Sequence, residues 1–174
     1  MTPQVRRIRA DESLRLRALR LHALAEAPMA YSSTLAHEQR YPDDVWRERA
    51  VGASIGCDRA TFIAEHNGRW VGLATGLARP DDSESAAPLL VGMFVDGNAR
   101  RAGVGVALVE AISGWARACG ARRLTLWVTI GNDPAVALYQ RCGFRPTGLT
   151  KPLPHTPTYV ECEMMRDLVA GTKR

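Results

Sequence analysis

The sequence predicts an α/β (α+β) domain in which helices cover a mixed sheet, and three observations lead to this class. The pair Asn67-Gly68 separates two apolar runs and readily takes the positive φ angles of a tight hairpin turn. Apolar residues from Val104 to Trp115 recur at the spacing of a helix with one buried face. Short apolar runs alternate with helical segments around this helix, which favours layers of helices on a sheet.

Length and composition indicate one globular domain. The 174 residues suffice to bury a sizeable core, so we expect a single domain over residues 1–174. Hydrophobic residues make up 46% and charged residues 24%, and no apolar run approaches the roughly 20 residues that cross a bilayer. The first 20 residues contain arginines but no apolar signal core, so we expect a cytoplasmic protein with no membrane partner.

The net charge of +5 suits nucleic acid, a membrane surface or an anionic cofactor. The arginines are scattered along helical stretches and are not interleaved with aromatic residues, which does not favour nucleic acid. The cysteines lie far apart without metal-ligand spacing, so we expect neither a disulfide framework nor a metal site. They are interpreted as small buried hydrophobes: Cys57, Cys119, Cys142 and Cys162.

The N-terminal third predicts a strand and two helices. Residues 4–9 suggest a short strand, and leucines among arginines after Asp11 predict a helix that Pro28 ends. A second helix is predicted within 42–51, where a proline and two aspartates form the first turn. We expect the polar segment 30–40 between them to be irregular and to lie over a cleft.

The remaining chain alternates strands and helices. Gly120 is predicted to end the helix that begins near Val104, and a shorter helix is predicted from Asn132 to Cys142. Residues 79–88 are predicted to form a charged loop. The predicted strands are 61–66 and 69–78 around the hairpin turn, then 89–95, 122–130, 144–148 and 158–168.

The turn at Arg100-x-x-Gly103-x-Gly105, between a strand and a helix, suits an anion. It lacks the lysine and hydroxyl of a nucleotide P-loop, and Leu108 stands where a dinucleotide fold needs a third small residue. Glycines allow close backbone approach, and the first amides of the helix point at a ligand. The alternative is that the glycines serve only to bend the chain between strand and helix, and that no anion binds. Two arginines beside the positive helix end favour a bound anion, such as a pyrophosphate.

Two motifs together resemble the GNAT superfamily of N-acetyltransferases. RRAGVG matches R/Q-x-x-G-x-G/A, and NDPAVALYQRCGF, residues 132–144, matches N-x-x-A-x-x-x-Y-x-x-x-G-F. The resemblance extends from about Thr61 to about Met165. It implies a mixed, mostly antiparallel sheet of about six or seven strands, flanked by helices. It also implies a splay between two central parallel strands, here residues 89–95 and 124–130.

The resemblance implies acetyl-CoA as cosubstrate, with its pyrophosphate on the backbone amides of residues 101–105 and its pantetheine along residues 93–95. Asn132 is similar to the family residue that contacts this arm. Arg101 and Arg141 are candidates for the phosphates, or alternatively solvated surface arginines. The expected cofactor-binding residues are Met93, Phe94, Val95, Arg100, Arg101, Ala102, Gly103, Val104, Gly105, Asn132, Ala135, Tyr139 and Arg141.

The reaction implied is attack of a neutral amine on a thioester carbonyl. Tyr139 is the candidate proton donor to the leaving thiolate, or alternatively a core aromatic residue. The predicted strand 89–95 lacks the glutamate that many family members use as general base. We select Glu38 because segment 30–40 lies where the family builds its acceptor site. The other candidates are Asp96, Glu161 and Glu163, and each of the four carboxylates could instead be an exposed surface group.

The function expected is therefore transfer of an acetyl group from acetyl-CoA to a primary amine, by direct attack in a ternary complex and without a metal. The acceptor is a small molecule or a peptide, and its specificity is expected to lie in residues 24–60. A CoA-binding regulatory domain without transfer activity and a basic nucleic-acid-binding module are the alternatives. Family habit suggests a homodimer.

Overall fold

The computed structural model describes residues 3–79 and 87–168, which form a layered structure around one seven-stranded sheet. The strand order is β1-β2-β3-β4-β5-β7-β6, with all neighbours antiparallel except β4 and β5. This confirms the predicted fold class. The strands are β1 (Gln4–Arg7), β2 (Arg59–His66), β3 (Arg69–Leu77), β4 (Leu89–Val95), β5 (Arg123–Thr129), β6 (Arg145–Leu153) and β7 (Thr156–Asp167).

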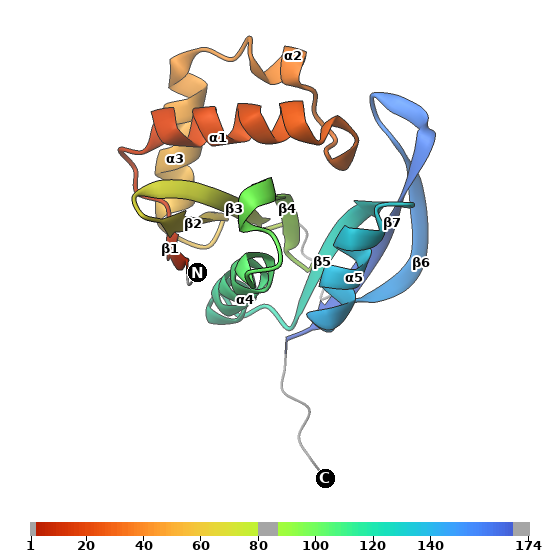
Figure 1. Cartoon of the computed structure of the whole chain (residues 1–174). Helices are drawn as coiled ribbons and strands as arrows, with labels where there is room; N and C mark the ends of the chain where they lie inside the picture. Colours follow the sequence, from red (N-terminus) through yellow and green to blue (C-terminus); the bar gives the residue numbers. More distant parts are fainter. Residues whose placement is uncertain (1–2, 80–86, 169–174) are drawn as a thin grey trace.

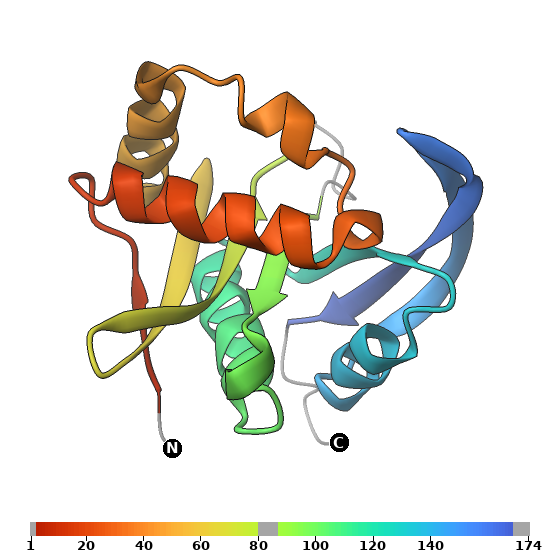
Figure 2. The same cartoon turned by 45° about the horizontal axis from the view of Figure 1, so that its top comes forward.

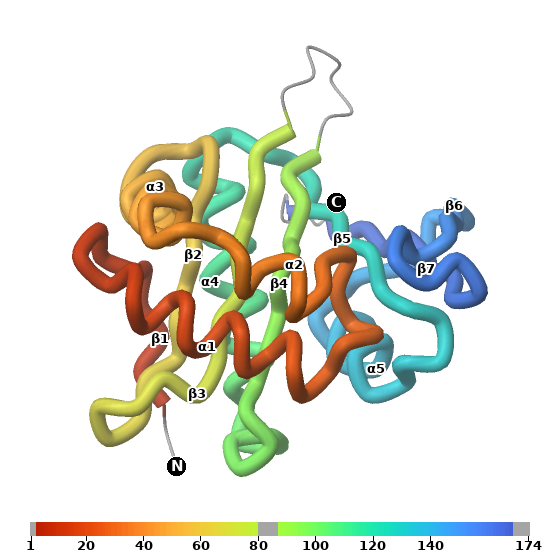
Figure 3. Tube along the Cα trace, turned by 90° about the horizontal axis from the view of Figure 1, so that it is seen from above, coloured from red at the N-terminus to blue at the C-terminus, as the bar shows by residue number. Residues whose placement is uncertain are grey.

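Helices cover both faces of the sheet (Figures 1 and 2). Three lie on one face: α1 (Ser13–Glu26), α2 (Leu35–Glu38) and α3 (Asp43–Ser54). The opposite face carries α4 (Val104–Ala118) and α5 (Asp133–Arg141). Seen from above, α1 crosses over β2, β3 and β4 (Figure 3). Short 3₁₀ turns at Pro28–Ala30 and Gly97–Ala99 follow α1 and β4.

The parallel strands β4 and β5 separate soon after they meet. They pair only at Leu89 with Thr125 and at Leu90 with Leu126. The register between β3 and β4 then shifts, and Gly92 has a φ of +62°, a left-handed conformation that glycine adopts at little cost. The predicted splay between the two central parallel strands is therefore present.

The core is built on the periodicities seen in the sequence. One face of α4, including Leu108 and Ile112, packs mainly on β2 and β3, in a buried cluster that extends to Leu126 of β5. A second cluster joins α1 to β2, β3 and β4 on the other face of the sheet. Within the described residues, no helix has the length and apolar character needed to span a membrane.

Most predicted elements are confirmed, and their boundaries follow turn chemistry. Asn67 and Gly68 have φ angles of +49° and +75° and connect β2 to β3. The side chain of Asn132 accepts a hydrogen bond from the Ala135 amide at the start of α5, and Gly143 follows α5 with a φ of +85°. Segment 30–40, predicted to be irregular, contains the single helical turn α2. Most of the predicted loop 79–88, residues 80–86, lies outside the described residues.

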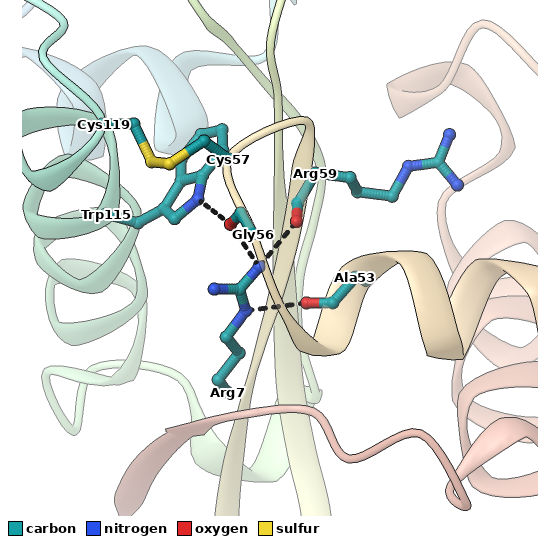
Figure 4. Close-up of a disulfide and its surroundings, with 7 residues drawn as sticks. All are labelled: Arg7, Ala53, Gly56, Cys57, Arg59, Trp115 and Cys119. Carbon is teal, nitrogen blue, oxygen red and sulfur yellow. Dashed lines mark hydrogen bonds between the residues drawn. A yellow bond between two sulfur atoms is a disulfide. The ribbon is translucent and has the colours of Figure 1, made fainter.

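A disulfide joins Cys57 to Cys119, so the prediction that no cysteine pairs is wrong (Figure 4). The pair is 62 residues apart and links the loop after α3 to the C-terminal end of α4. Only the packing of α4 against β2 and β3 brings these two positions together, which sequence spacing does not reveal. Cys142 and Cys162 are unpaired, and Cys142 is buried as expected.

Hydrogen bonds surround this disulfide and connect four elements (Figure 4). The Trp115 indole donates to the carbonyl of Gly56 at 3.2 Å. The guanidinium of Arg7 donates to the carbonyls of Ala53, Gly56 and Arg59 at 2.7–2.9 Å. The disulfide therefore lies at a hydrogen-bonded junction of β1, α3, β2 and α4.

We expect the double variant Cys57→Ser/Cys119→Ser to lose about 3 kcal/mol of unfolding free energy, because the unfolded chain then lacks a cross-link that closes a long loop. Urea denaturation with and without a reductant measures the loss. Reductant should lower the wild-type midpoint to that of the double variant and leave the variant unchanged. Coincident curves for wild type and variant without reductant would contradict the bond.

Candidate functional site

Two adjoining cavities meet where β4 and β5 separate. The larger, of about 1010 Å³, lies between β4, the start of α4 and α5. The smaller, of about 370 Å³, lies between the sheet and the layer of α1, α2 and α3. The residues that line both are Ala30, Tyr31, Leu90, Val91, Gly92 and Trp127. A molecule in one cavity can therefore reach a molecule in the other.

The larger cavity ends on backbone amides that have no acceptor. Gly103 precedes α4 with a φ of +78°, and no side chain caps this helix. The first amide of the region to donate is that of Ala107, to the carbonyl of Gly103 at 3.0 Å. Among the described residues, the amides of 101–106 have no hydrogen-bond acceptor. These donors at the positive end of a helix are suited to a phosphate or pyrophosphate.

The two glycines of this turn have different roles. Gly103 provides the left-handed conformation, and a Cβ there would meet open space. A Cβ on Gly105 would lie 2.9 Å from Cδ2 of Leu138, the end of a flexible side chain on α5, so a larger residue at 105 would require that side chain to shift. Gly105 thus lies against Leu138 as well as lining the larger cavity, whereas the sequence interpretation assigned both glycines to ligand approach alone.

The residues predicted to bind the cofactor gather at the larger cavity, with two departures. All of them line it except Ala102, whose side chain packs against the core. Arg100 lines it, but its guanidinium donates to the carboxylate of Glu26 and to the carbonyl of Val95. The anion beside Arg100 is thus a carboxylate of α1, which the sequence argument for a bound anion did not consider. Arg101 and Arg141 form no ion pair within the described residues.

Tyr139 lies on α5 and lines the larger cavity as predicted. Its side chain is buried against Phe144, and its hydroxyl forms no hydrogen bond with the described residues. Burial, together with the neighbouring Tyr31, raises the pKa of the Tyr139 phenol above its usual value. The phenol therefore stays protonated at neutral pH, and the same raised pKa makes it a weaker proton donor than a free phenol.

Tyr31 is a site residue that the sequence analysis missed. It lines both cavities, and its hydroxyl donates to the carbonyl of Met93 on β4 at 3.1 Å. Burial raises the pKa of Tyr31 to about 12, and the Arg20 guanidinium lies 4.6 Å above its ring. No motif marks this tyrosine, because its position depends on how the chain after α1 folds back over the sheet.

Glu38 lines the smaller cavity but is held by two arginines. Its carboxylate accepts hydrogen bonds from Arg20 at 2.7 Å and from Arg49 at 3.0 Å, and its side chain is only 2% exposed. Burial alone would raise its pKa, but the hydrogen bonds and charge of Arg20, with the charge of Arg49, bring it below the usual value. The alternative of an exposed surface group is wrong for Glu38, and a carboxylate this stable accepts protons poorly.

Glu161 lines the same cavity and has a carboxylate oxygen that accepts no hydrogen bond from the described residues. It lies on β7 opposite Thr129 of β5, and the residue is 3% exposed. Its Oε2 is buried without a hydrogen-bond partner among the described residues. The nearest cation is Lys151, whose Nζ lies 3.8 Å from that oxygen and 4.2 Å above the Trp127 ring. Burial raises the pKa of Glu161.

The other two candidate bases are engaged elsewhere. Asp96 accepts a hydrogen bond from the Asn98 amide at 3.0 Å and lines neither cavity. Glu163, also buried, accepts from the Thr147 hydroxyl at 2.9 Å and lines neither cavity. Of the four candidates, Glu161 alone combines a position at a cavity with an unpartnered oxygen.

Comparison with known proteins identifies the family. Residues 20–144 match the model of the acetyltransferase (GNAT) family, and no curated protein matches significantly. An acetyltransferase of the GNAT family from Streptococcus pneumoniae shares 20% identity at a TM-score of 0.80, over 95% of this chain and 99% of that one. A Salmonella typhimurium protein solved with its cofactor acetyl-CoA shares 16% identity at a TM-score of 0.77, over 100% and 98%.

A ribosomal-protein-alanine N-acetyltransferase from Brucella melitensis shares 22% identity at a TM-score of 0.69, over 94% of this chain and 99% of that one. At these identities the structural likenesses show the fold. The family model covers most of the chain and includes both the glycine turn and α5. The chain therefore belongs to the GNAT family of acetyltransferases, for which acetyl-CoA is the acyl donor.

Proposed function

We propose that this protein is an N-acetyltransferase that moves the acetyl group of acetyl-CoA to a primary amine by direct attack in a ternary complex. The observation that carries the proposal is the meeting of two cavities at the splay of β4 and β5. One ends on the unpaired amides of residues 101–106, and the other presents the buried carboxylate of Glu161. A donor site and an acceptor site thus adjoin.

On the donor side, the amides before α4 are suited to the pyrophosphate, with Arg101 and Arg141 at the rim of the larger cavity. Asn132 lines this cavity with its oxygen turned to the Ala135 amide, which leaves its side-chain NH₂ for the pantetheine arm. The cavity continues between β4 and β5 to the residues shared with the smaller cavity. We place the thioester at this junction.

On the acceptor side, Glu161 takes the role of general base instead of Glu38. A carboxylate with a raised pKa is a better proton acceptor than one stabilised by two arginines. The substrate ammonium gives one proton to Glu161, and its nitrogen forms the new C–N bond while the C–S bond breaks. The sulfur takes a proton from Tyr139, which regains one from the nitrogen. This sequence balances without a metal.

The assignment is tested by incubating the purified protein with acetyl-CoA and a panel of amines and following thioester consumption. We expect acetyl-CoA to raise the melting temperature and at least one amine to be acetylated, with the product identified by mass spectrometry. Stabilisation without turnover of any amine would instead indicate a regulatory CoA-binding domain. DNA or RNA binding that weakens steeply with salt, without stabilisation by CoA, would indicate a nucleic-acid-binding module.

The role of Glu161 predicts a pH effect. Because a base acts only when deprotonated, wild-type kcat/KM should fall as the pH drops through its raised pKa. Glu161→Gln should lower kcat by about 10²- to 10⁴-fold and remove that acidic limb. Glu163→Gln, two residues away on the same strand, is the matched control and should retain both activity and limb. An unchanged pH profile in Glu161→Gln would assign the base elsewhere.

Glu38 is expected to stabilise the fold. Glu38→Gln leaves Arg20 and Arg49 without their carboxylate, so the free energy of unfolding should fall by about 3 kcal/mol at neutral pH. Because its folded pKa is lowered, this contribution is complete above the pKa of an unfolded glutamate and is lost as the pH falls through the folded value. Denaturation at several pH values measures it. Glu48→Gln, exposed on α3, should leave stability unchanged.

A further inference from the structure

Unpartnered polar atoms gather at the smaller cavity. Among the described residues, six buried side-chain nitrogen or oxygen atoms lack a hydrogen-bond partner. Four of the six belong to residues that line this cavity: Arg20 Nη1, Ser33 Oγ, which lies beside the Glu38 carboxylate, Trp46 Nε1 and Glu161 Oε2. A buried polar group without a partner costs about 1–3 kcal/mol, so proteins rarely leave several together. Their concentration around one cavity points to a polar ligand that reaches them when the lining side chains shift, because each atom is itself shielded from solvent.

The four atoms divide into two chemical sets on different sides of the cavity. Arg20 on α1 and Trp46 on α3 offer N–H donors from the helical layer. The Ser33 hydroxyl lies in the chain segment between these two helices. Glu161 offers an acceptor from β7, which lies beyond β5 in the sheet. The complementary ligand therefore has acceptor atoms at one end and a donor at the other.

The charges around the cavity favour an anionic acceptor group. The charged residues that line it are Arg20, Arg49, Arg59, Lys151, Glu38 and Glu161. Four cations thus face two carboxylates. Glu38 pairs with both Arg20 and Arg49, whereas the guanidinium of Arg59 has no ion pair or hydrogen bond within the described residues. An amine without an acid group would leave this positive charge uncompensated.

We propose that the acceptor substrate is an amino-acid-sized molecule that carries a primary amine together with an acid group, either a carboxylate or a phosphonate. The amine lies at Glu161, and the acid group lies at the donors of the helical layer and Arg59. A cavity of about 370 Å³ is of the size that holds a small molecule. This inference rests on the proposed acetyltransferase function and defines the substrate class of that same site.

The test compares matched pairs of amines that differ only in the acid group. A series of ω-amino acids and ω-aminoalkylphosphonates is assayed beside the corresponding amines, for example 4-aminobutyrate beside propylamine. We expect the best acid-bearing member to exceed its partner in kcat/KM by at least about tenfold, as one charge-assisted hydrogen bond provides. The carboxylate and phosphonate arms separate the two kinds of acid group.

The variant Arg59→Gln provides a second test of the acid-binding site. It should lower kcat/KM for the acid-bearing substrate by about ten- to hundredfold, mainly through KM, and change it little for the partner amine. The matched control is Arg69→Gln, which removes the same charge from an exposed position on the β2–β3 hairpin that lines neither cavity. This control should behave like wild type with both substrates.

The outcomes separate this inference from the proposed function. Equal or faster acetylation of amines without the acid group, or an Arg59→Gln effect equal on both members of a pair, overturns the inference and leaves the acetyltransferase in place. Binding is also followed by the fluorescence of Trp46 and Trp127 in the CoA-bound protein. If no acid-bearing amine binds or turns over, the inference fails. If acetyl-CoA itself neither stabilises the protein nor is consumed, the proposed function fails.

Discussion

The separation of β4 from β5 after two paired positions is the constraint on which the rest of the site depends. Beyond Leu90, the edge of β4 that faces β5 is released from the ladder, and the bulge at Gly92 turns the strand further. An opening inside a sheet exposes main-chain groups that must find other partners. Both cavities border this opening, so the same departure from regular pairing creates the donor site and the acceptor site.

The chain that follows α1 spans this opening. The hydroxyl of Tyr31 donates to the carbonyl of Met93 on β4, and the hydroxyl of Thr129 on β5 donates to the carbonyl of Met29 at 2.8 Å. Glu26, at the end of α1, pairs with Arg100 beside the glycine turn. The helical layer is therefore fastened to both separated strands and to the start of α4. These contacts position the part of the helical layer that lines the smaller cavity relative to the larger cavity.

Sequence analysis predicts the features that depend on neighbours in the chain. The Asn67-Gly68 turn, the apolar face of α4 and the capping of α5 by Asn132 are all local, and each is present in the structure. The two motifs are likewise short segments. Nearly all the residues predicted to bind the cofactor lie at one cavity. Local periodicity and turn chemistry therefore suffice for most of the elements, and the family motifs place the predicted cofactor-binding residues together.

The acceptor side depends on contacts between distant segments. Three contacts join positions that no spacing rule connects. They are the ion pair of Arg100 with Glu26, the ion pair of Arg20 with Glu38, and the Cys57–Cys119 disulfide. Glu161 was one of several equivalent carboxylates in the sequence, and only its burial on β7 distinguishes it. The close contact of Gly105 with Leu138 has a consequence of the same long-range kind. Leu138 precedes Tyr139 on α5, so a side chain at 105 would push on the residue next to the candidate proton donor as well as alter the turn that carries the unpaired amides.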